Sequence, residues 1–249
     1  MAVVLKSSQE IEKMRRAGQV VREVLELVRG KVKPGATTLD LEKAAESRLK
    51  ELGVKAAFKG YHGYPCVLCT SVNSEVVHGI PSPRRVLKDG DIVSVDFGVV
   101  IDGYYGDAAI TVPVGSVAPE TQKLLHVTEE SLKAGIAAVR PGATLGDVGS
   151  AVQKVVEGQG FSVVRDFVGH GIGSNMHEDP QVPNFGEAGH GMKLKAGMVI
   201  AIEPMVNAGR PDVKVLDDGW TAVASDGSMS AHFEHTVAVT ATGARILTE

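Results

Sequence analysis

Five residues of this chain have the side-chain types and the spacing that a metal centre requires: Asp96, Asp107, His170, Glu203 and Glu234. Asp96 and Glu203 end two similar strings, LKDGDIVSVD and LKAGMVIAIE, which lie 107 residues apart. Each of these acids is followed, one predicted strand later, by a second acid. Buried carboxylates are costly to desolvate unless they are paired or bind metals. Four carboxylates and one imidazole form an oxygen-rich set that suits two divalent ions, Co, Mn, Fe or Zn, and the sequence leaves the physiological ion open.

The imidazole of this set depends on its neighbours in the chain. His170 lies in FVGHGIG, where glycines on both sides let the backbone come close and leave the ring free to reach inward. The matching segment of the first half, GYHG around His62, is shifted by one residue. The repeat is therefore symmetric in its scaffold and asymmetric in its ligands.

The acids must be positioned by strands, and the sequence predicts that the strands of Asp96 and Asp107 form a hairpin. Asp102 and Gly103 form a strong turn signal between two β-rich runs, which are Ile92–Phe97 and Tyr104–Val112. In that register Asp96 lies opposite Ala109, and Asp107 is two positions away on the same face. Both carboxylates of the first half should therefore point the same way.

In the second half the counterparts of these two strands are the β-rich runs Met198–Val206 and Phe233–Thr240. Between them lies the loop-rich stretch Asn207–Ser230, about 20 residues longer than its counterpart. Insertions beside a site often shape the substrate pocket, and we expect this one to do so.

Two helices should precede the strands in each half. Capping boxes and apolar periodicity predict helices from Ser7 to Gly30, from Thr37 to Gly53, from about Pro119 to Val139, and from Thr144 to Gly158. The PGAT that opens at Pro34 recurs at Pro141, at the same offset as the acids. We therefore expect one catalytic domain over residues 1–249, with an internal repeat of approximately 1–117 and 118–249.

Composition excludes several classes of protein. Hydrophobic residues make up 43% and charged residues 22% of the 249, as in ordinary globular chains. No apolar run approaches the roughly 20 residues that span a bilayer, and the first residues lack the apolar segment of a signal peptide. We expect a cytoplasmic protein without a membrane partner.

Charge and cysteine content add two weaker expectations. Net charge is −4, although residues 1–60 carry 13 Lys and Arg against 8 Asp and Glu. A basic helix is usually a solvated face, so we predict no specific nucleic-acid partner. Cys66 and Cys69 are the only cysteines, which leaves a C-x-x-C zinc site without its second pair, and we expect packed or pocket-lining thiols.

Several longer motifs resemble those of one enzyme family over essentially the whole chain. VDFGVVIDGYYGD, GHGIGSNMHEDP, AIEP and HFEHTV are similar to the metal-binding motifs of type I methionine aminopeptidase. YHGYPCVLCTSVNSEVVHGIP resembles the substrate-side motif of the same family. The resemblance implies the α+β pita-bread fold of creatinases and aminopeptidases, in which two halves related by a pseudo-twofold axis form antiparallel sheets covered by helices.

The resemblance also implies an activity. It predicts a dinuclear-metal methionyl aminopeptidase that removes the N-terminal initiator methionine from nascent proteins and peptides with a small second residue. By resemblance, Asp107 and Glu234 bridge the ions, Asp96 serves one ion, and His170 and Glu203 serve the other. Paired ions lower the pKa of a bound water toward about 7, and Glu203 would accept the proton of that water. Met peptides of nascent chains are the expected partners, any ribosome contact would use the folded surface, and a monomer is expected.

The remaining implied residues concern the substrate. His78 and His177 match positions that contact substrate and steady the tetrahedral intermediate, where a donor can contribute roughly 3 to 4 kcal/mol. The methionine pocket and its rim would comprise Phe58, Tyr61, His62, Tyr64, Cys69, Met176 and Trp220. The other histidines, His126, His190, His232 and His235, are interpreted as structural.

Two positions depart from the family pattern. Met176 stands where an aromatic residue is usual, which alters the shape of the pocket. Ala108 and Ala109 follow Asp107 where hydroxyl residues are common, which removes hydrogen bonds to the metal site.

Two other functions are alternatives on the same scaffold. A hydrolase of the prolidase or aminopeptidase P kind would prefer proline-containing substrates, but those relatives carry an extra N-terminal domain, whereas the first helix is expected here from Ser7. A metal-free binding protein on the same scaffold would have lost ligands, and all five are present.

Overall fold

The computed structural model describes residues 3–249, in which four helices pack against antiparallel strands. The helices are α1 (Ser8–Arg29), α2 (Thr38–Leu52), α3 (Pro119–Ala137) and α4 (Leu145–Gly158), with a 3-10 turn, η1, at Tyr61–Gly63. The first half contains the strands β1 (Lys55–Ala56), β2 (Leu68–Val72), β3 (Glu75–Val77), β4 (Ile92–Ile101) and β5 (Tyr104–Pro113). The second half contains β6 (Ser162–Val163), β7 (Gly169–Gly171), β8 (Glu178–Val182), β9 (Val199–Ile202), β10 (Met205–Asn207), β11 (Val213–Val215), β12 (Ala222–Ala224), β13 (Ser230–His232), β14 (Glu234–Thr240) and β15 (Gly243–Ile246).

Local sequence explains where the helices begin. The Ser7 hydroxyl accepts a hydrogen bond from the Glu10 backbone N–H, and the Glu10 carboxylate accepts one from Ser7 N. Thr37 and Thr144 cap α2 and α4 with the same reciprocal pair of bonds. A cap of this kind is worth about 1 kcal/mol. The helix α3 has Pro119 in its first turn instead of a side-chain cap and ends two residues before the predicted Val139.

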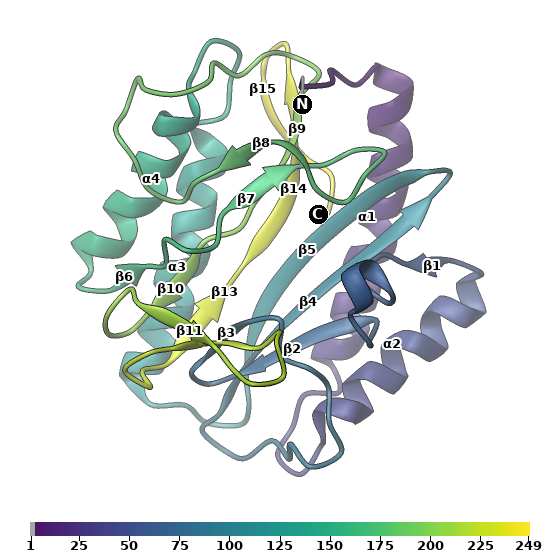
Figure 1. Cartoon of the computed structure of the whole chain (residues 1–249), viewed down its shortest axis with the longest axis vertical. Helices are drawn as coiled ribbons and strands as arrows, with labels where there is room; N and C mark the ends of the chain where they lie inside the picture. Colours follow the sequence, from purple (N-terminus) through teal and green to yellow (C-terminus); the bar gives the residue numbers. More distant parts are fainter. Residues whose placement is uncertain (1–2) are drawn as a thin grey trace.

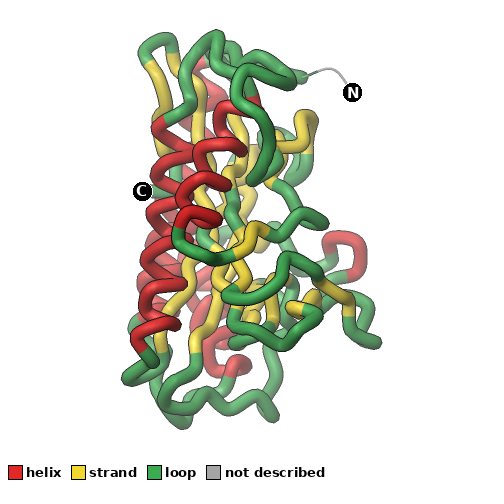
Figure 2. Tube along the Cα trace, turned by 90° about the vertical axis from the view of Figure 1, so that its left-hand side faces the viewer, coloured by secondary structure: helices red, strands yellow, loops and turns green. Residues whose placement is uncertain are grey.

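The helices and the main sheet form two layers. Within residues 3–249 the main sheet has nine strands, in the order β1-β4-β5-β14-β9-β7-β8, with β2 beside β4 and β15 beside β14. Figure 2 shows the helices together on one side of the strands, and Figure 1 shows α1 and α2 over one half and α3 and α4 over the other. Val24 packs with Phe97 in one core cluster, and Val148 packs with Ile200 in another. Each half thus has its own apolar contact between helices and sheet.

The sequence repeat produces repeated contacts. Thr37 forms an isolated antiparallel bridge with Val86, and Thr144 forms one with Lys193. Both pairs are shifted by the same 107 residues as the acids. In each half the PGAT turn thus caps a helix and pairs with the segment that leads into an acid-bearing strand.

The halves join at the centre of the main sheet, where β5 pairs with β14. Asp96 lies opposite Ala109, as predicted, and Ala109 in turn lies opposite Glu234. Directly opposed residues of an antiparallel sheet share a face, and residues two apart on one strand also share it. Asp96, Asp107 and Glu234 therefore project from one face of three adjacent strands, with the small Ala109 between them.

Two expectations for the second half differ from the structure. The run Met198–Val206 is not one strand: β9 belongs to the main sheet, and β10 pairs with β13 and β6 in a small second sheet. The break falls at Glu203 and Pro204, because proline has no N–H to give to a ladder. The stretch Asn207–Ser230 is also more ordered than expected, since β11 and β12 within it pair and extend onto β3.

No helix within residues 3–249 combines the length and the apolar character needed to cross a bilayer. Cys66 and Cys69 are free thiols, the first half-buried and the second buried.

Candidate metal centre and substrate pocket

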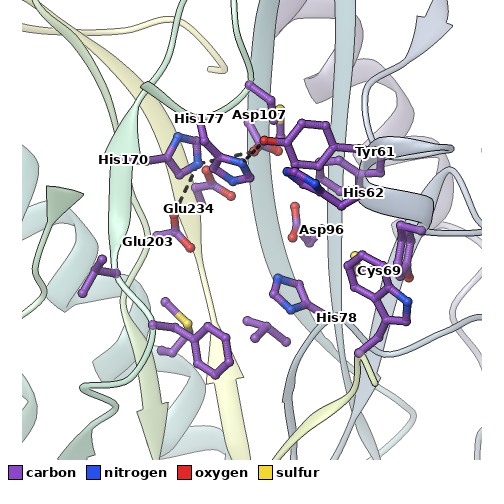
Figure 3. Close-up of a pocket in the computed structure, with 18 residues that line it drawn as sticks. Tyr61, His62, Cys69, His78, Asp96, Asp107, His170, His177, Glu203 and Glu234 are labelled. Atoms are coloured by element: carbon purple, nitrogen blue, oxygen red, sulfur yellow. Dashed lines mark hydrogen bonds and ion pairs between the residues drawn. The ribbon is translucent and has the colours of Figure 1, made fainter. Parts of the chain in front are cut away.

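A cavity of about 310 Å³ lies on the open face of the main sheet. Among the described residues that line it, none belongs to α1–α4. Every residue predicted for the site lines this cavity, as Figure 3 shows for the labelled ones: Phe58, Tyr61, His62, Tyr64, Cys69, His78, Asp96, Asp107, His170, Met176, His177, Glu203, Trp220 and Glu234. Segments more than a hundred residues apart in the sequence thus meet at one place.

The acids and His170 stand close enough to share ions. One ligand atom from each of Asp107, His170 and Glu234 lies within 4.8 Å of the others. The Nε2 atom of His170 is 3.6 Å from Glu203 Oε1 and 4.0 Å from Asp107 Oδ2. Asp96 reaches the same cavity from β4. The arrangement gathers five donors from four strands and one strand end.

Unsatisfied oxygens at this cluster fit divalent cations. Asp96 Oδ1, Asp107 Oδ1 and Glu234 Oε1 are buried atoms without a hydrogen-bond partner among the described residues. Buried polar atoms are normally paired, and carboxylate oxygens left this way are suited to coordinate a metal. The oxygen-rich donor set with a single imidazole therefore fits the predicted ions, whose number and identity stay predictions.

The electrostatics of the cluster support the same interpretation. Loss of hydration raises the pKa of Glu234 well above its ordinary value, and repulsion from Glu203 adds to this shift. Loss of hydration and then repulsion from Glu234 likewise raise the pKa of Asp107, and desolvation raises the pKa of Asp96 to about 7. Cations would offset both the repulsion and the lost hydration.

The imidazole is oriented to donate a lone pair. His170 Nδ1 lies 2.9 Å from the carbonyl oxygen of Gly171, a geometry in which Nδ1–H donates and Nε2 is left free toward the acids. Burial lowers the pKa of His170 to about 3, which keeps the ring neutral. The flanking glycines are needed: a Cβ on Gly169 would lie 2.3 Å from Ala201 O, and one on Gly171 would lie 2.2 Å from Asp179 O. This accords with the close backbone approach expected from the sequence.

The second group of polar residues borders the cluster. His177 stacks edge-on to His170 with ring centroids 4.3 Å apart, and its Nδ1 is 2.7 Å from the Tyr61 hydroxyl. Burial lowers the pKa of His78 to about 4, so this ring is neutral and retains one N–H to donate. His62 packs edge-on to Tyr61 at the exposed rim.

Soft and aromatic side chains form the rest of the cavity. Phe58, Tyr64, Cys69 and Met176 are all buried and pack in one cluster, with Trp220 partly buried against them. The Tyr64 hydroxyl donates to backbone carbonyls, so its ring is fixed in place. Polarisable sulfur and aromatic surface of this kind suits a thioether side chain.

Sequence reasoning missed several residues around this site. Val77, Phe167, Val168 and Met205 also line the cavity. Phe167 packs edge-on to His78 at 5.6 Å, a neighbour that no local pattern indicates.

Two further residues, Thr236 and His232, lie close to the acids. The Thr236 hydroxyl donates to Asp107 O and accepts from Asp107 N, so a hydroxyl from β14 supports Asp107, although Ala108 and Ala109 offer none. His232 was interpreted as structural, yet its Nε2 lies 3.7 Å from Glu203 Oε2. Its position two residues before Glu234 was the available signal, since alternate residues of extended chain share a face.

Comparison with known proteins gives matches over nearly the whole chain. A sequence profile of metallopeptidase family M24 matches residues 12–241. The chain is 52% identical over 246 residues to methionine aminopeptidase of Clostridium perfringens, across 99% of this chain and 98% of that protein. A crystal structure of methionine aminopeptidase from Thermotoga maritima matches with a TM-score of 0.98 at 51% identity, over 100% of both chains.

A more distant likeness concerns the fold alone. Prolidase from Pyrococcus horikoshii matches with a TM-score of 0.79 at 22% identity, over 99% of this chain and 63% of that one. Together with the Thermotoga structure, it confirms the predicted pita-bread architecture.

Proposed function

The chain belongs to metallopeptidase family M24, and we propose that it removes the N-terminal methionine from nascent proteins and peptides whose second residue is small. The observation that carries this proposal is the joining of two features in one cavity. Five metal-type donors lie beside a pocket of buried sulfur and aromatic side chains. A metal-dependent peptidase with a pocket for a thioether side chain is the activity that uses both.

The five donors would divide between two divalent ions. Asp107 and Glu234 would contribute to holding both, Asp96 would hold one, and His170 and Glu203 would hold the other. Bound there, the ions polarise a carbonyl and lower the pKa of water toward about 7.

The side chains of the protein do the rest of the chemistry. Glu203 accepts a proton at its carboxylate, which lies beside His170 and His232 and whose backbone carbonyl accepts a hydrogen bond from Asn184 Nδ2 at 3.1 Å. His78 and His177 donate hydrogen bonds where negative charge develops on the scissile carbonyl, each worth roughly 3 to 4 kcal/mol.

The shape of the pocket accounts for the substrate. The methionine side chain would lie against Cys69, Met176 and Tyr64, which are 3 to 5% exposed and close the inner end of the cavity. Its free α-amine then lies beside the acids, so cleavage follows the first residue only. Cytoplasmic location, a monomeric state, absence of a nucleic-acid partner and contact with the ribosome surface belong to this proposal as predictions.

Peptide hydrolysis tests the proposal directly. Protein loaded with Mn²⁺ or Co²⁺ should release methionine from Met-Ala-Ser and leave Met-Lys-Ser intact, since a bulky second residue does not fit beside the acids. An X-Pro peptide is the control, because the prolidase likeness concerns the fold alone. Cleavage of X-Pro with no methionine release would overturn the assignment.

A further inference from the structure

A hydrogen bond crosses the mouth of the cavity between the two halves. The Tyr61 hydroxyl lies 2.7 Å from Nδ1 of His177, and 116 residues separate the two in sequence. Figure 3 shows the phenol and the imidazole facing each other beside the acids. Within residues 3–249 this hydroxyl has no other side-chain or backbone partner. Among the described residues, this contact is thus the one hydrogen bond of the Tyr61 hydroxyl.

His177 needs a partner to keep one orientation. Its side chain is exposed at the rim, and its remaining ring contacts are edge-on or tilted packing against His170 and Tyr61. An exposed side chain samples several rotamers unless a directed bond selects one. The backbone beneath it is already fixed, because Glu178 accepts a hydrogen bond from Asn175 N and forms a buried ion pair with Lys6. The orientation of the His177 ring is therefore what the hydrogen bond to Tyr61 restricts.

Tyr61 itself is held by its turn. Gly60, which precedes η1, and His62 and Gly63 within it all have positive φ, at 90°, 48° and 89°. Four backbone bonds close the turn: Tyr61 N donates to Phe58 O, Gly63 N to Gly60 O, Tyr64 N to Tyr61 O, and Gly60 N to Tyr64 O. Left-handed conformation is costly for a residue other than glycine, so His62 indicates a turn shape that its surroundings impose. The turn places the phenol above the cavity.

We infer that Tyr61 is a positioning residue for His177: its hydroxyl donates to Nδ1, which orients the ring and leaves the imidazole proton on Nε2. The inference rests on the proposed function for its catalytic meaning, because His177 can stabilise a developing oxyanion only through an N–H. The reverse arrangement, with Nδ1–H donating to Tyr61, would leave a lone pair on Nε2 as the group available to substrate. It would also leave the phenol proton without a protein acceptor among the described residues.

The tautomer can be measured without turnover. Nitrogen-15 NMR of metal-free protein labelled at histidine distinguishes a protonated ring nitrogen from an unprotonated one, with His177→Ala supplying the assignment. We expect Nδ1 of His177 to be unprotonated in the native protein and the two tautomers to be mixed in Tyr61→Phe. Tyr64→Phe is the matched control, because it removes another phenol hydroxyl from the same cavity and should leave the tautomer of His177 unchanged.

Kinetics supply the second readout. In metal-loaded protein Tyr61→Phe should lower kcat for Met-Ala-Ser about 3- to 10-fold, the range of one net hydrogen bond. KM should change little because the ring remains. In a His177→Ala background the same change should have no further effect. Tyr104→Phe, which removes a hydroxyl bonded to Glu10 away from the cavity, should leave kcat unchanged.

The outcomes separate this inference from the proposed function. A native protein with its His177 proton on Nδ1 overturns the inference, and so does a Tyr61→Phe variant with unchanged tautomer and kcat. Failure of the native protein to release methionine overturns the proposed function instead, while the tautomer of the metal-free protein is measured independently.

Discussion

The two halves of the main sheet bring acids to the cavity by different means. In the first half β4 and β5 pair without a break over ten residues each, around a turn in which Asp102 and Gly103 both have positive φ. In the second half the strand before the acid stops at Ile202, and the chain then enters another sheet. The first half positions both of its acids by ladder register; the second half does so for Glu234, whereas Glu203 relies on contacts from distant segments.

This difference separates local from non-local control of the site. Asp96 and Asp107 face the cavity because strand alternation puts them there. Glu203 is held instead by Asn184 on its backbone carbonyl, and its carboxylate lies 3.6 and 3.7 Å from the imidazole nitrogens of His170 and His232. Substitutions in the turn of the first hairpin should therefore lower the free energy of unfolding and leave kcat nearly unchanged. Around Glu203, each substitution should remove a single contact of that residue.

The largest effect, a loss of bound metal and of activity, is expected from a substitution on β14, where the two halves meet. Glu234→Ala on β14 should lower metal stoichiometry together with activity, the latter by more than about a hundredfold, since even residues one layer beyond a metal typically change activity 10- to 100-fold. Metal analysis and methionine release on the same sample measure both. Glu187→Ala is the control, because that carboxylate is 81% exposed on a surface loop. Undiminished metal content in Glu234→Ala would contradict its role as a bridge.

The next effect concerns how the N-terminal segment stabilises the second half. Lys6 and Glu178 form a buried ion pair, with side chains 4% and 12% exposed. Lys6→Met would leave the carboxylate next to His177 without its cation, and we expect the free energy of unfolding to fall by about 3 kcal/mol. Urea denaturation measures it. The exposed pair of Lys59 and Glu46 offers the matched control, where Lys59→Met should cost less than about 1 kcal/mol. Equal losses would remove the distinction.

A smaller effect tests the first hairpin turn. Gly103 has φ of +78°, and an added Cβ would meet no atom within 4 Å, so Gly103→Ala introduces backbone strain alone. We expect a loss of about 1 to 2 kcal/mol in unfolding free energy, with kcat retained because the acids lie several ladder pairs away. Thermal unfolding and peptide assays check the two parts. Gly158→Ala, in helix α4 with open space around it, should raise stability instead.

The smallest effect is expected from pH at the long connection of the second half. Hydrogen bonds from Arg210 N, the Ser228 hydroxyl and Ser228 N lower the pKa of Asp226 to about 2 from an ordinary 3.8. A carboxyl with a lowered folded-state pKa stabilises the fold above its unfolded pKa and loses that contribution as pH falls through the folded value. Denaturation midpoints between pH 5 and 2 should therefore fall less steeply for Asp226→Asn than for the native chain. Parallel curves would show that these bonds do not stabilise the loop.

Much of the site was predictable because its signals are local or repeated. The capping boxes, the Asp102–Gly103 turn and the register of Asp96 with Ala109 follow from short-range rules, and the structure agrees with each. The break at Pro204 was missed because a run of apolar residues reads as one strand, although proline marks where a ladder must stop.

The contributions of Thr236, His232 and Phe167 were not predictable in the same way. Thr236 supports Asp107 across the joint between the halves, and Phe167 packs on His78 from 89 residues away. Contacts of this kind depend on which strands become neighbours, and no pattern along the chain records that.

The sequence by itself determined which side chains could bind metal, which faces of the strands they occupy, and that the chain repeats its scaffold, because turn chemistry and strand alternation act over a few residues. Only the tertiary structure decided how β5 meets β14, so that Asp96, Ala109 and Glu234 align across three strands. It also decided that Tyr61 reaches His177 across the cavity. Pairing between distant segments is chosen by the packing of the whole core, which no short stretch of sequence contains.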